Sequence, residues 1–252
     1  MSSVFPSALI DVSTVAHAHG NMVGDLVAKL QCFPEVGQII LTHNIPDNDG
    51  VVEAENTRII QNATPKGFGA NHNAAFAHST APYFCVLNPD IELPTNPFPA
   101  LLAALNGSGT SVLAPGVVNS AGYPEDSARR FPTLRRLATK LIGGHDGRYA
   151  LKPTQGPTPV DWMAGMFMLF RAEDFKAIGG FDEKFFLYYE DVDICTRLWK
   201  AGRPVMVCPQ VQVVHDAQRA SHKNWQFMKW HAASMARYFW KQWCRLPRNS
   251  VL

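Results

Sequence analysis

The chain has 252 residues, of which 46% are hydrophobic and 17% charged, with a formal net charge of +2. This composition is typical of a folded protein with one large α/β domain or two small ones. No run of about 18 apolar residues occurs and the N-terminus lacks a basic start, so we expect neither a transmembrane helix nor a secretory signal. Five scattered cysteines without a CxxC pair fit a reducing cytosol better than a disulfide framework or a zinc site.

Strand and helix patterns alternate over the first 90 residues of the chain. Apolar runs predict strands at residues 8–16, 36–43, 57–62 and 82–87, and helices are expected at about 21–33 and 66–78. This alternation implies an α/β fold with a mostly parallel sheet, whose ligands bind outside the carboxyl ends of the strands. Asn44 and Asp90 each follow one of these strands, so we expect both at that edge.

Residues 119–159 break this rhythm with several prolines and glycines, and we expect a partly mobile excursion that contains a short helix. The excursion carries a basic cluster composed of Arg129, Arg130, Arg135, Arg136 and Lys140. This cluster is either an ordinary solvated face or a surface for an anionic partner. The alternation of strand and helix resumes afterwards, at residues 166–171, 190–201 and 204–214.

The most informative segment runs from Val160 to Arg197 and contains a run of aromatic residues followed by three carboxylates. Glu190, Asp191 and Asp193 fall within four residues, where like charges repel unless a proton, a cation or a polar substrate uses them. The structural alternative is a solvated helix start, because acidic residues favour the first turn. The preceding sequence FFLYY looks half-buried, and this favours a functional role.

Three further candidates lie at predicted strand or helix ends. Asp90, in LNPDIELP, can hold a divalent cation such as Mg²⁺, or it is a turn residue beside a proline. His215 ends the strand VCPQVQVVH and could complete a metal site with Asp90, or it is a structural histidine. The sequence KGFGANHN at residues 66–73 opens a helix whose free N–H groups can bind an anion, unless the glycines merely start the helix.

The tail after Asp216 holds seven Lys or Arg and no acidic residue, so it is strongly basic while the rest of the chain is acidic. Residues 223–248 show a helical pattern with an apolar stripe and a basic side. The stripe comprises Trp225, Met228, Ala232, Met235, Phe239, Trp243 and Leu246, and the opposite side holds Arg237, Lys241, Arg245 and Arg248. Such a helix fits an anionic membrane surface, or it packs its stripe on the domain. Trp230 and Trp240 lie off the stripe, which slightly favours membrane contact.

Taken together, these segments resemble a family-2 glycosyltransferase of the GT-A fold, over nearly the whole chain from Val12 to about Trp240. The most specific segments are LNPDIELP, DWMAGMFMLFR, GGFDEKFFLYYEDVDICTRLWKAG and VCPQVQVVH. VAHAHGN, GFGANHNAA and RRFPT resemble bacterial O-antigen rhamnosyltransferases of the WbbL-like group. The resemblance implies a Rossmann-like sheet flanked by helices in a catalytic domain at residues 1–222, followed by an amphipathic helix at 223–252. The domain would divide into a nucleotide-binding half, about 1–118, and an acceptor-binding half, about 119–222.

The resemblance also implies roles for individual residues. Asp191 matches the general base that takes the proton from the acceptor hydroxyl, and Glu190 would orient the base or contact the acceptor. Asp90 matches the last aspartate of a DxD-type element and would hold Mg²⁺ or Mn²⁺ on the diphosphate, with His215 completing the site. Nucleotide-sugar contacts are expected at Asn44, Gly69, Asn71, Asn88 and Asp90, and acceptor contacts at Trp162, Gly165 and Glu190. The chain departs from the family pattern where Asn88 replaces the first DxD aspartate, and where its second strand ends in THN.

The implied reaction moves L-rhamnose from dTDP-β-L-rhamnose to a lipid-diphosphate-linked GlcNAc-type acceptor, with inversion, in bacterial surface polysaccharide synthesis. The protein would be cytoplasmic and peripheral at the inner face of the cell membrane, held on anionic lipid by residues 223–248, with no nucleic acid partner. The alternatives are a UDP- or GDP-sugar donor, a nucleotidyltransferase, or a non-catalytic membrane-docking domain. A glycine-rich phosphate loop after the first strand is absent, which disfavours a nucleotidyltransferase. The presence of Asp90, Glu190 and Asp191 disfavours a non-catalytic domain.

Overall fold

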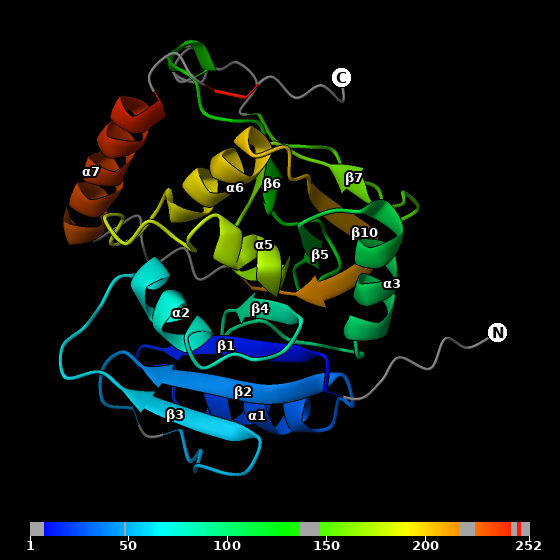
Figure 1. The fold of residues 1–252 in the computed structure, drawn as a ribbon, viewed down its shortest axis with the longest axis vertical. Coiled ribbons are helices and arrows are strands. Elements are labelled where there is room, and N and C mark those ends of the chain that lie inside the picture. Colours follow the sequence, from blue (N-terminus) through cyan, green and yellow to red (C-terminus); the bar gives the residue numbers. More distant parts are fainter. Residues whose placement is uncertain (1–7, 48, 137–146, 217–224, 243–245, 248–252) are drawn as a thin grey trace.

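The computed structural model describes residues 8–47, 49–136, 147–216, 225–242 and 246–247, and it is centred on one eight-stranded sheet (Figure 1). The strands of this sheet follow the order β3-β2-β1-β4-β9-β5-β10-β7. They are β1 (Ile10–Ala16), β2 (Val36–His43), β3 (Thr57–Gln61), β4 (Tyr83–Leu87), β5 (Val112–Val118), β7 (Thr158–Pro159), β9 (Phe167–Arg171) and β10 (Val205–Val214). A separate two-stranded ribbon pairs β6 (Ala128–Arg129) with β8 (Trp162–Met163). The helices are α1 (Asn21–Gln31), α2 (Phe68–Phe76), α3 (Phe98–Ser108), α5 (Ala172–Ala177), α6 (Glu190–Lys200) and α7 (Trp225–Gln242).

The predicted mostly parallel sheet is confirmed, with β9 as an antiparallel strand near its middle. Strands β1 to β4 pair in parallel, and β5 pairs in parallel with β10. Strand β9 runs against both β4 and β5, so that Phe167 at its start lies opposite Leu87 at the end of β4. The residues that precede β9 therefore reach the edge where the parallel strands end.

Helices cover both faces of the sheet, and alternating side chains on the central strands feed two apolar cores. In β4, Cys85 and Leu87 pack into the core that includes α1 and α3. Phe84 and Val86 point the other way, into the core that includes α2, α5 and α6. The period of two along a strand sends successive side chains to opposite faces, and burial of both faces explains why β4 is almost wholly apolar.

The sequence analysis gave no prediction for α3 and β5. Helix α3 has Pro99 in its first turn, contains Gly107 and is followed by Gly109, whose φ of 63° is left-handed and suits a helix end. Strand β5 contains Pro115 and Gly116, opposite a register shift in β10 between Cys208 and Gln212. In its described part, residues 119–136 and 147–159, the excursion contributes short strands and a helical stretch at residues 134–136. Lys140 of the predicted basic cluster lies outside the described residues.

The C-terminal helix does not dock on the domain through its whole apolar stripe, which was one of the two alternatives left open by the sequence. Trp225 and Met228, which belong to that stripe, are 67% and 52% exposed. The buried residues of α7 are Ser234, Tyr238 and Gln242. Lys223, Trp243, Arg245 and Arg248 of the predicted helix lie outside the described residues.

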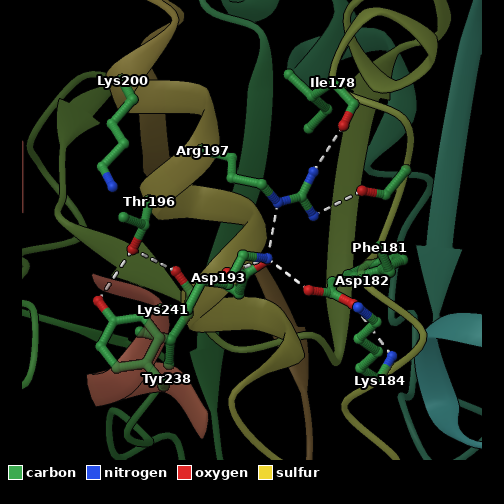
Figure 2. A network of polar contacts seen from close by, with 12 residues as sticks. Ile178, Phe181, Asp182, Lys184, Asp193, Thr196, Arg197, Lys200, Tyr238 and Lys241 are labelled. Atoms are coloured by element: carbon green, nitrogen blue, oxygen red, sulfur yellow. Dashed lines mark hydrogen bonds and ion pairs between the residues drawn. The ribbon is translucent and has the colours of Figure 1, made fainter. Parts of the chain in front are cut away.

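A polar network explains this orientation (Figure 2). Asp193 of α6 is fully buried, and Lys241 places its Nζ 2.8 Å from Asp193 and 2.5 Å from Asp182. The Tyr238 hydroxyl lies 3.0 Å from the hydroxyl of Thr196. Asp193 also pairs with Arg197 of its own helix at 2.7 Å, and Lys241 and Gln242 of α7 complete the hydrogen bonds of this buried carboxylate. Because buried polar groups are stable only when they are paired, these bonds favour docking of the face of α7 that carries Tyr238, Lys241 and Gln242. Lys241, which the sequence pattern places on the outer basic side, therefore points inward.

Candidate active site

Asp90 and His215 meet at the carboxyl edge of the sheet, as the sequence predicts. Asp90 follows β4 and His215 follows β10, and an antiparallel bridge between Glu92 and Val214 draws the two chain segments together. The backbone N–H of His215 donates to the carbonyl of Val118, at 2.9 Å. His215 Nε2 lies 3.2 Å from Asp90 Oδ2, so the ring and the carboxylate form a hydrogen-bonded pair.

Each member of this pair favours the charged form of the other. Burial alone would raise the pKa of Asp90, but the hydrogen bond and the charge of His215 hold the pKa below its ordinary value. The bond to Asp90 raises the pKa of His215, against the opposing effect of burial. Burial lowers the pKa of His19, which also lies in the electrostatic field of Asp90. His19 was not among the predicted site residues, although it follows β1 in the HAHG sequence and lies at the same edge as Asp90.

The pair fits a divalent cation that is completed by substrate oxygens. Asp90 Oδ1 and His215 Nδ1 are buried and have no hydrogen-bond partner among the described residues. Within the described part of the chain, no three His, Cys, Asp or Glu side chains form a closed metal cage. Mg²⁺ commonly takes one or two carboxylates and fills its other positions with water and substrate phosphates, so two protein ligands are sufficient.

Asn44 and Asn71, two of the predicted nucleotide contacts, belong to one hydrogen-bonded cluster at the same edge. Asn62 donates to the side-chain oxygens of both, at 2.9 and 2.7 Å. Asn44 also accepts from the backbone N–H of Lys66 and donates to the Lys66 carbonyl, at 2.8 and 3.0 Å. These bonds tie the ends of β2 and β3 to the turn before α2, so the cluster sets the position of that turn.

Gly69 packs against protein rather than facing open space. A Cβ at Gly69 would lie 2.6 Å from the Cβ of Phe181, and one at Gly67 would lie 2.6 Å from the carbonyl oxygen of Phe186. The N–H of Phe68 donates to that same carbonyl, at 2.9 Å. The glycines allow the start of α2 to approach the segment that leads into α6.

Glu190 and Asp191 form a carboxylate pair at the start of α6. Asp191 accepts hydrogen bonds from the N–H of Val192 at 2.8 Å and from the N–H of Gly165 at 3.2 Å. Burial raises the pKa of Asp191 to about 6, against the effect of these bonds. Burial, together with the charge of Asp191, raises the pKa of Glu190 well above its ordinary value. The two backbone hydrogen bonds favour the ionised form of Asp191, so this carboxyl is the member of the pair suited to accept a proton.

The turn before the pair is strained and is supported by α7. Tyr188 and Tyr189 have φ values of 70° and 68°, in the left-handed region that costs of order 1–3 kcal/mol for such residues. The ring of His231 packs against both tyrosines, with centroid distances of 5.3 and 5.4 Å. Contacts from a helix more than 30 residues later thus help to position Glu190 and Asp191.

The carboxylate pair lines a pocket of about 270 Å³, together with Trp162. The indole Nε1 of Trp162 donates to the carbonyl of Arg130, at 3.0 Å. The segment before β9 links this pocket to the edge of the sheet. The N–H of Gly165 donates to Asp191 in the pocket, and the carbonyl of Met166 accepts from the N–H of Asn88 at 2.9 Å, in the loop that carries Asp90. The structure thus brings the predicted acceptor residues together, next to the loop that carries Asp90. His231, which also lines the pocket, has no local signal in the sequence, because only the docking of α7 brings it there.

A mostly parallel sheet with one inner antiparallel strand, an acid and a histidine at its edge and a carboxylate pair in the adjoining pocket define a GT-A glycosyltransferase. Solved glycosyltransferases share this fold. GalNAc-T7 with UDP, GalNAc and Mn²⁺ superposes with a TM-score of 0.63 at 15% identity, over 83% of this chain and 44% of that one. The mannosyltransferase PcManGT from Pyrobaculum calidifontis with GDP-Man and Mn²⁺ gives 0.59 at 12% identity, over 95% of this chain and 66% of that one.

The chain belongs to glycosyl transferase family 2, whose family model matches residues 48–179. A second model, described as the N-terminal domain of galactosyltransferase, matches residues 148–223. Rhamnosyltransferase WbbL of Escherichia coli K12 is 27% identical over 263 residues, which cover 96% of each chain. The N-acetylglucosaminyl-diphospho-decaprenol L-rhamnosyltransferase of Mycobacterium tuberculosis H37Rv is also 27% identical, over 86% of this chain and 78% of that one. These similarities confirm the family, the fold and the glycosyltransferase activity expected from the sequence.

Proposed function

We propose that this glycosyltransferase moves L-rhamnose from dTDP-β-L-rhamnose to a hydroxyl of a lipid-diphosphate-linked GlcNAc-type acceptor, with inversion, in bacterial surface polysaccharide synthesis. The names of the two relatives support rhamnose as the transferred sugar, and the mycobacterial name supports the class of acceptor. The observation that carries the proposal is the carboxylate pair Glu190 and Asp191, which lines a pocket with Trp162 and is linked through Gly165 to the segment beside the Asp90 loop.

In the proposed reaction, Asp191 is the general base. It accepts the proton of the acceptor hydroxyl as the oxygen attacks the anomeric carbon of the donor, and the nucleoside diphosphate leaves from the opposite side. The N–H groups of Gly165 and Val192 hold the carboxylate in place for this transfer. Glu190, whose Oε2 is buried and has no partner among the described residues, would contact an acceptor oxygen and help to orient the acceptor. A single displacement inverts the anomeric centre without a covalent intermediate.

Asp90 and His215 would hold a divalent cation, Mg²⁺ or Mn²⁺, at the donor side. When bound, the cation stabilises negative charge on a leaving diphosphate. Both structural neighbours named above were solved with Mn²⁺, which supports the same class of ion here. Asn88 lies between this loop and the start of β9, where it would contact the donor. The Asn44–Asn71 cluster, with Gly69 packed behind it, would position the backbone of the turn at residue 66 against the nucleotide.

The two halves of the catalytic domain would divide the substrates between them. Asn44 and Asp90, from the half at about 1–118, would face the nucleotide sugar. Trp162, Gly165 and Asp191, from the half at about 119–222, would face the acceptor. His215 crosses this division and completes the donor side from the end of β10.

The direct test is release of nucleoside diphosphate from a panel of dTDP-, UDP- and GDP-sugars, with a farnesyl-diphospho-GlcNAc acceptor, in Mg²⁺ or Mn²⁺ and again in EDTA. We expect release from dTDP-rhamnose alone, and only with acceptor present. Release from a UDP- or GDP-sugar would keep the family mechanism and overturn rhamnose. Release from no donor by a folded protein would overturn the acceptor class or the catalytic role.

The same proposal places the protein at the cytoplasmic face of the cell membrane, with α7 on an anionic lipid surface. No described helix is long and apolar enough to cross a bilayer. Helix α7 lies at the side of the molecule, beside α6 (Figure 1), and exposes Trp225, Met228 and Trp240. Lys229 and Arg237 on the same helix are also exposed. Exposed tryptophans beside basic side chains are typical of an interfacial helix.

Substitution of exposed side chains tests this placement without disturbing the docked face of α7. Trp225→Ser combined with Trp240→Ser is expected to reduce co-sedimentation with anionic vesicles. Tyr123→Ser, at a residue 70% exposed elsewhere on the protein, is the matched control and leaves binding unchanged. Equal sedimentation of the double variant and the control would overturn the membrane role of α7.

A further inference from the structure

The acceptor pocket is lined by an arginine wall, defined here as Arg129, Arg130 and Arg136, as well as by Glu190 and Asp191. Burial raises the pKa of Tyr189, and the positive charge of Arg129 opposes this rise. The Arg129 charge therefore lies close to the start of α6. A substrate that reaches the carboxylate pair therefore also passes a positively charged surface.

Two described carboxylates, those of Asp126 and Asp161, pair with arginines of this wall. Asp126 pairs with two arginines: it forms an ion pair with Arg129, and its Oδ2 lies 3.4 Å from the Nε of Arg148. Asp161 is 3.9 Å from Arg136. Among the described residues, no carboxylate lies within ion-pair distance of Arg130. The described carboxylates thus leave an excess of positive charge here, suited to an anionic ligand.

Arg130 is held in place by its backbone and by the face of a ring. Its N–H donates to the carbonyl of Gly147 at 2.8 Å, and its own carbonyl accepts from Trp162 at 3.0 Å. Its guanidinium carbon lies 5.2 Å from the centre of the Tyr149 ring. Stacking of this kind orients the planar donors of arginine for paired hydrogen bonds to phosphate oxygens.

A second, mostly apolar groove of about 390 Å³ continues from this wall. Pro132 lines both the groove and the acceptor pocket, so the two are contiguous. Leu134, Phe239 and Leu246 give the groove its apolar character, and Leu134 is 65% exposed. The groove is therefore contiguous with the pocket that holds both the carboxylate pair and the arginines.

The geometry points to a three-part acceptor subsite, in which Arg130, with Arg129 and Arg136, binds the acceptor's diphosphate and the groove at Leu134 binds the first isoprene units. This inference rests on the proposed lipid-diphosphate acceptor and assigns each part of it to named residues. A polyprenyl diphospho-sugar joins a sugar, two negative charges and an apolar chain, and these match the carboxylate pair, the arginines and the apolar groove in chemical character. Arg129 and Arg136 keep their acidic partners and strengthen the local positive field.

Binding measured by calorimetry, without any donor, tests the arginine wall. The probes are farnesyl-diphospho-GlcNAc, methyl-diphospho-GlcNAc and decyl-GlcNAc, and the last has no phosphate. Arg130→Ala is expected to raise Kd for both diphosphates by about 10- to 100-fold, the effect of losing charge-assisted hydrogen bonds, and to leave decyl-GlcNAc unchanged. Arg130→Lys, which keeps the charge but loses the planar donors, should fall between. Arg135→Ala, at an exposed arginine that does not line the pocket, is the matched control.

The groove is tested with the same probes. Leu134→Gln is expected to weaken farnesyl-diphospho-GlcNAc and to leave methyl-diphospho-GlcNAc unchanged. The arginine assignment would be overturned if wild type, Arg130→Ala and Arg135→Ala had equal Kd values for both diphosphates and unchanged melting temperatures. It would also be overturned if the wild type bound neither diphosphate. An equal effect of Leu134→Gln on both diphosphates would overturn the groove. Because no donor is present, failure to transfer rhamnose would overturn the proposed donor and leave these binding results standing.

Discussion

Replacement of Lys241 by methionine removes one charge from the interface between α6 and α7 and keeps most of the side-chain volume. In the wild type, the Nζ of Lys241 lies 2.8 Å from the fully buried Asp193 and 2.5 Å from Asp182. It also lies 5.7 Å from the ring centre of Phe185, a contact that the thioether of methionine can replace. We expect Lys241→Met to weaken the docking of α7 without opening a cavity.

The expected loss of stability in Lys241→Met depends on the hydrogen bonds that Asp193 and Asp182 keep in the variant. Asp193 keeps the bond from Arg197 Nε at 2.7 Å, so the cost stays below the roughly 3–5 kcal/mol of leaving a buried charge unpaired. A charge-assisted hydrogen bond is worth about 1.5–3 kcal/mol, and the bond to partly exposed Asp182 adds little after solvent screening. We therefore expect a loss of about 2–3 kcal/mol, which lowers Tm by roughly 5–10 °C for a chain of this size.

Thermal unfolding and amide hydrogen exchange measure the two ways in which this loss can appear. A drop in Tm reports cooperative unfolding, whereas faster exchange confined to α7 reports local undocking of the helix. Lys229→Met is the control, because Lys229 is on the same helix and its charge contacts only the ring of Trp225 among the described residues. The control is expected to change stability by less than about 0.5 kcal/mol. The same Tm and the same exchange in both variants would refute the docking role of Lys241.

Four other outcomes are expected. Asp191→Asn should lower kcat by about 10²- to 10⁴-fold with donor affinity retained, and normal turnover would exclude Asp191 as the base. Because the base must be ionised and the pKa of Asp191 is raised to about 6, kcat/KM should fall as pH decreases through this value, and a flat profile would contradict the assignment. Gly69→Ala would bring a Cβ to 2.6 Å from Phe181 and should destabilise the protein by about 1–3 kcal/mol, whereas Gly107→Ala, in open space within a helix, should not lower Tm. EDTA should abolish transfer and Mg²⁺ or Mn²⁺ should restore it, whereas Asp90→Asn should stay weakly active at any metal concentration; full activity in EDTA would rule out a cation at Asp90.

The edge of the sheet could be predicted from the sequence because its geometry follows from simple rules. Parallel strands end at one edge, so residues that follow them converge even when they are far apart in sequence. Asp90 and His215 are 125 positions apart and nevertheless form a hydrogen-bonded pair. The aromatic run before Glu190 and Asp191 likewise indicated burial of their carboxyl groups, and the structure places both beside Trp162.

The orientation of α7 could not be predicted, because it depends on contacts that no local pattern encodes. An apolar stripe predicts which face is buried only when apolar contacts dominate the interface. Here Asp193, on another helix, is paired with Arg197 of its own helix, and Lys241 of α7 adds a second cation to this buried carboxylate. The arginine wall could be seen only as a cluster of charges, because its position beside Asp191 follows from the pairing of β6 with β8.

The residues proposed to face the acceptor and those proposed to face the donor come from separate stretches of the chain. Arg130 and Trp162 belong to the segment between β5 and β9, whereas Asn44 and Asp90 follow β2 and β4. Connecting segments on a protein surface tolerate changes in length and sequence without altering strand register. Acceptor preference can therefore diverge during evolution by exchange of one surface segment, while the machinery that activates the sugar is retained. The same exchange offers a practical route to engineered glycosyltransferases with new acceptors.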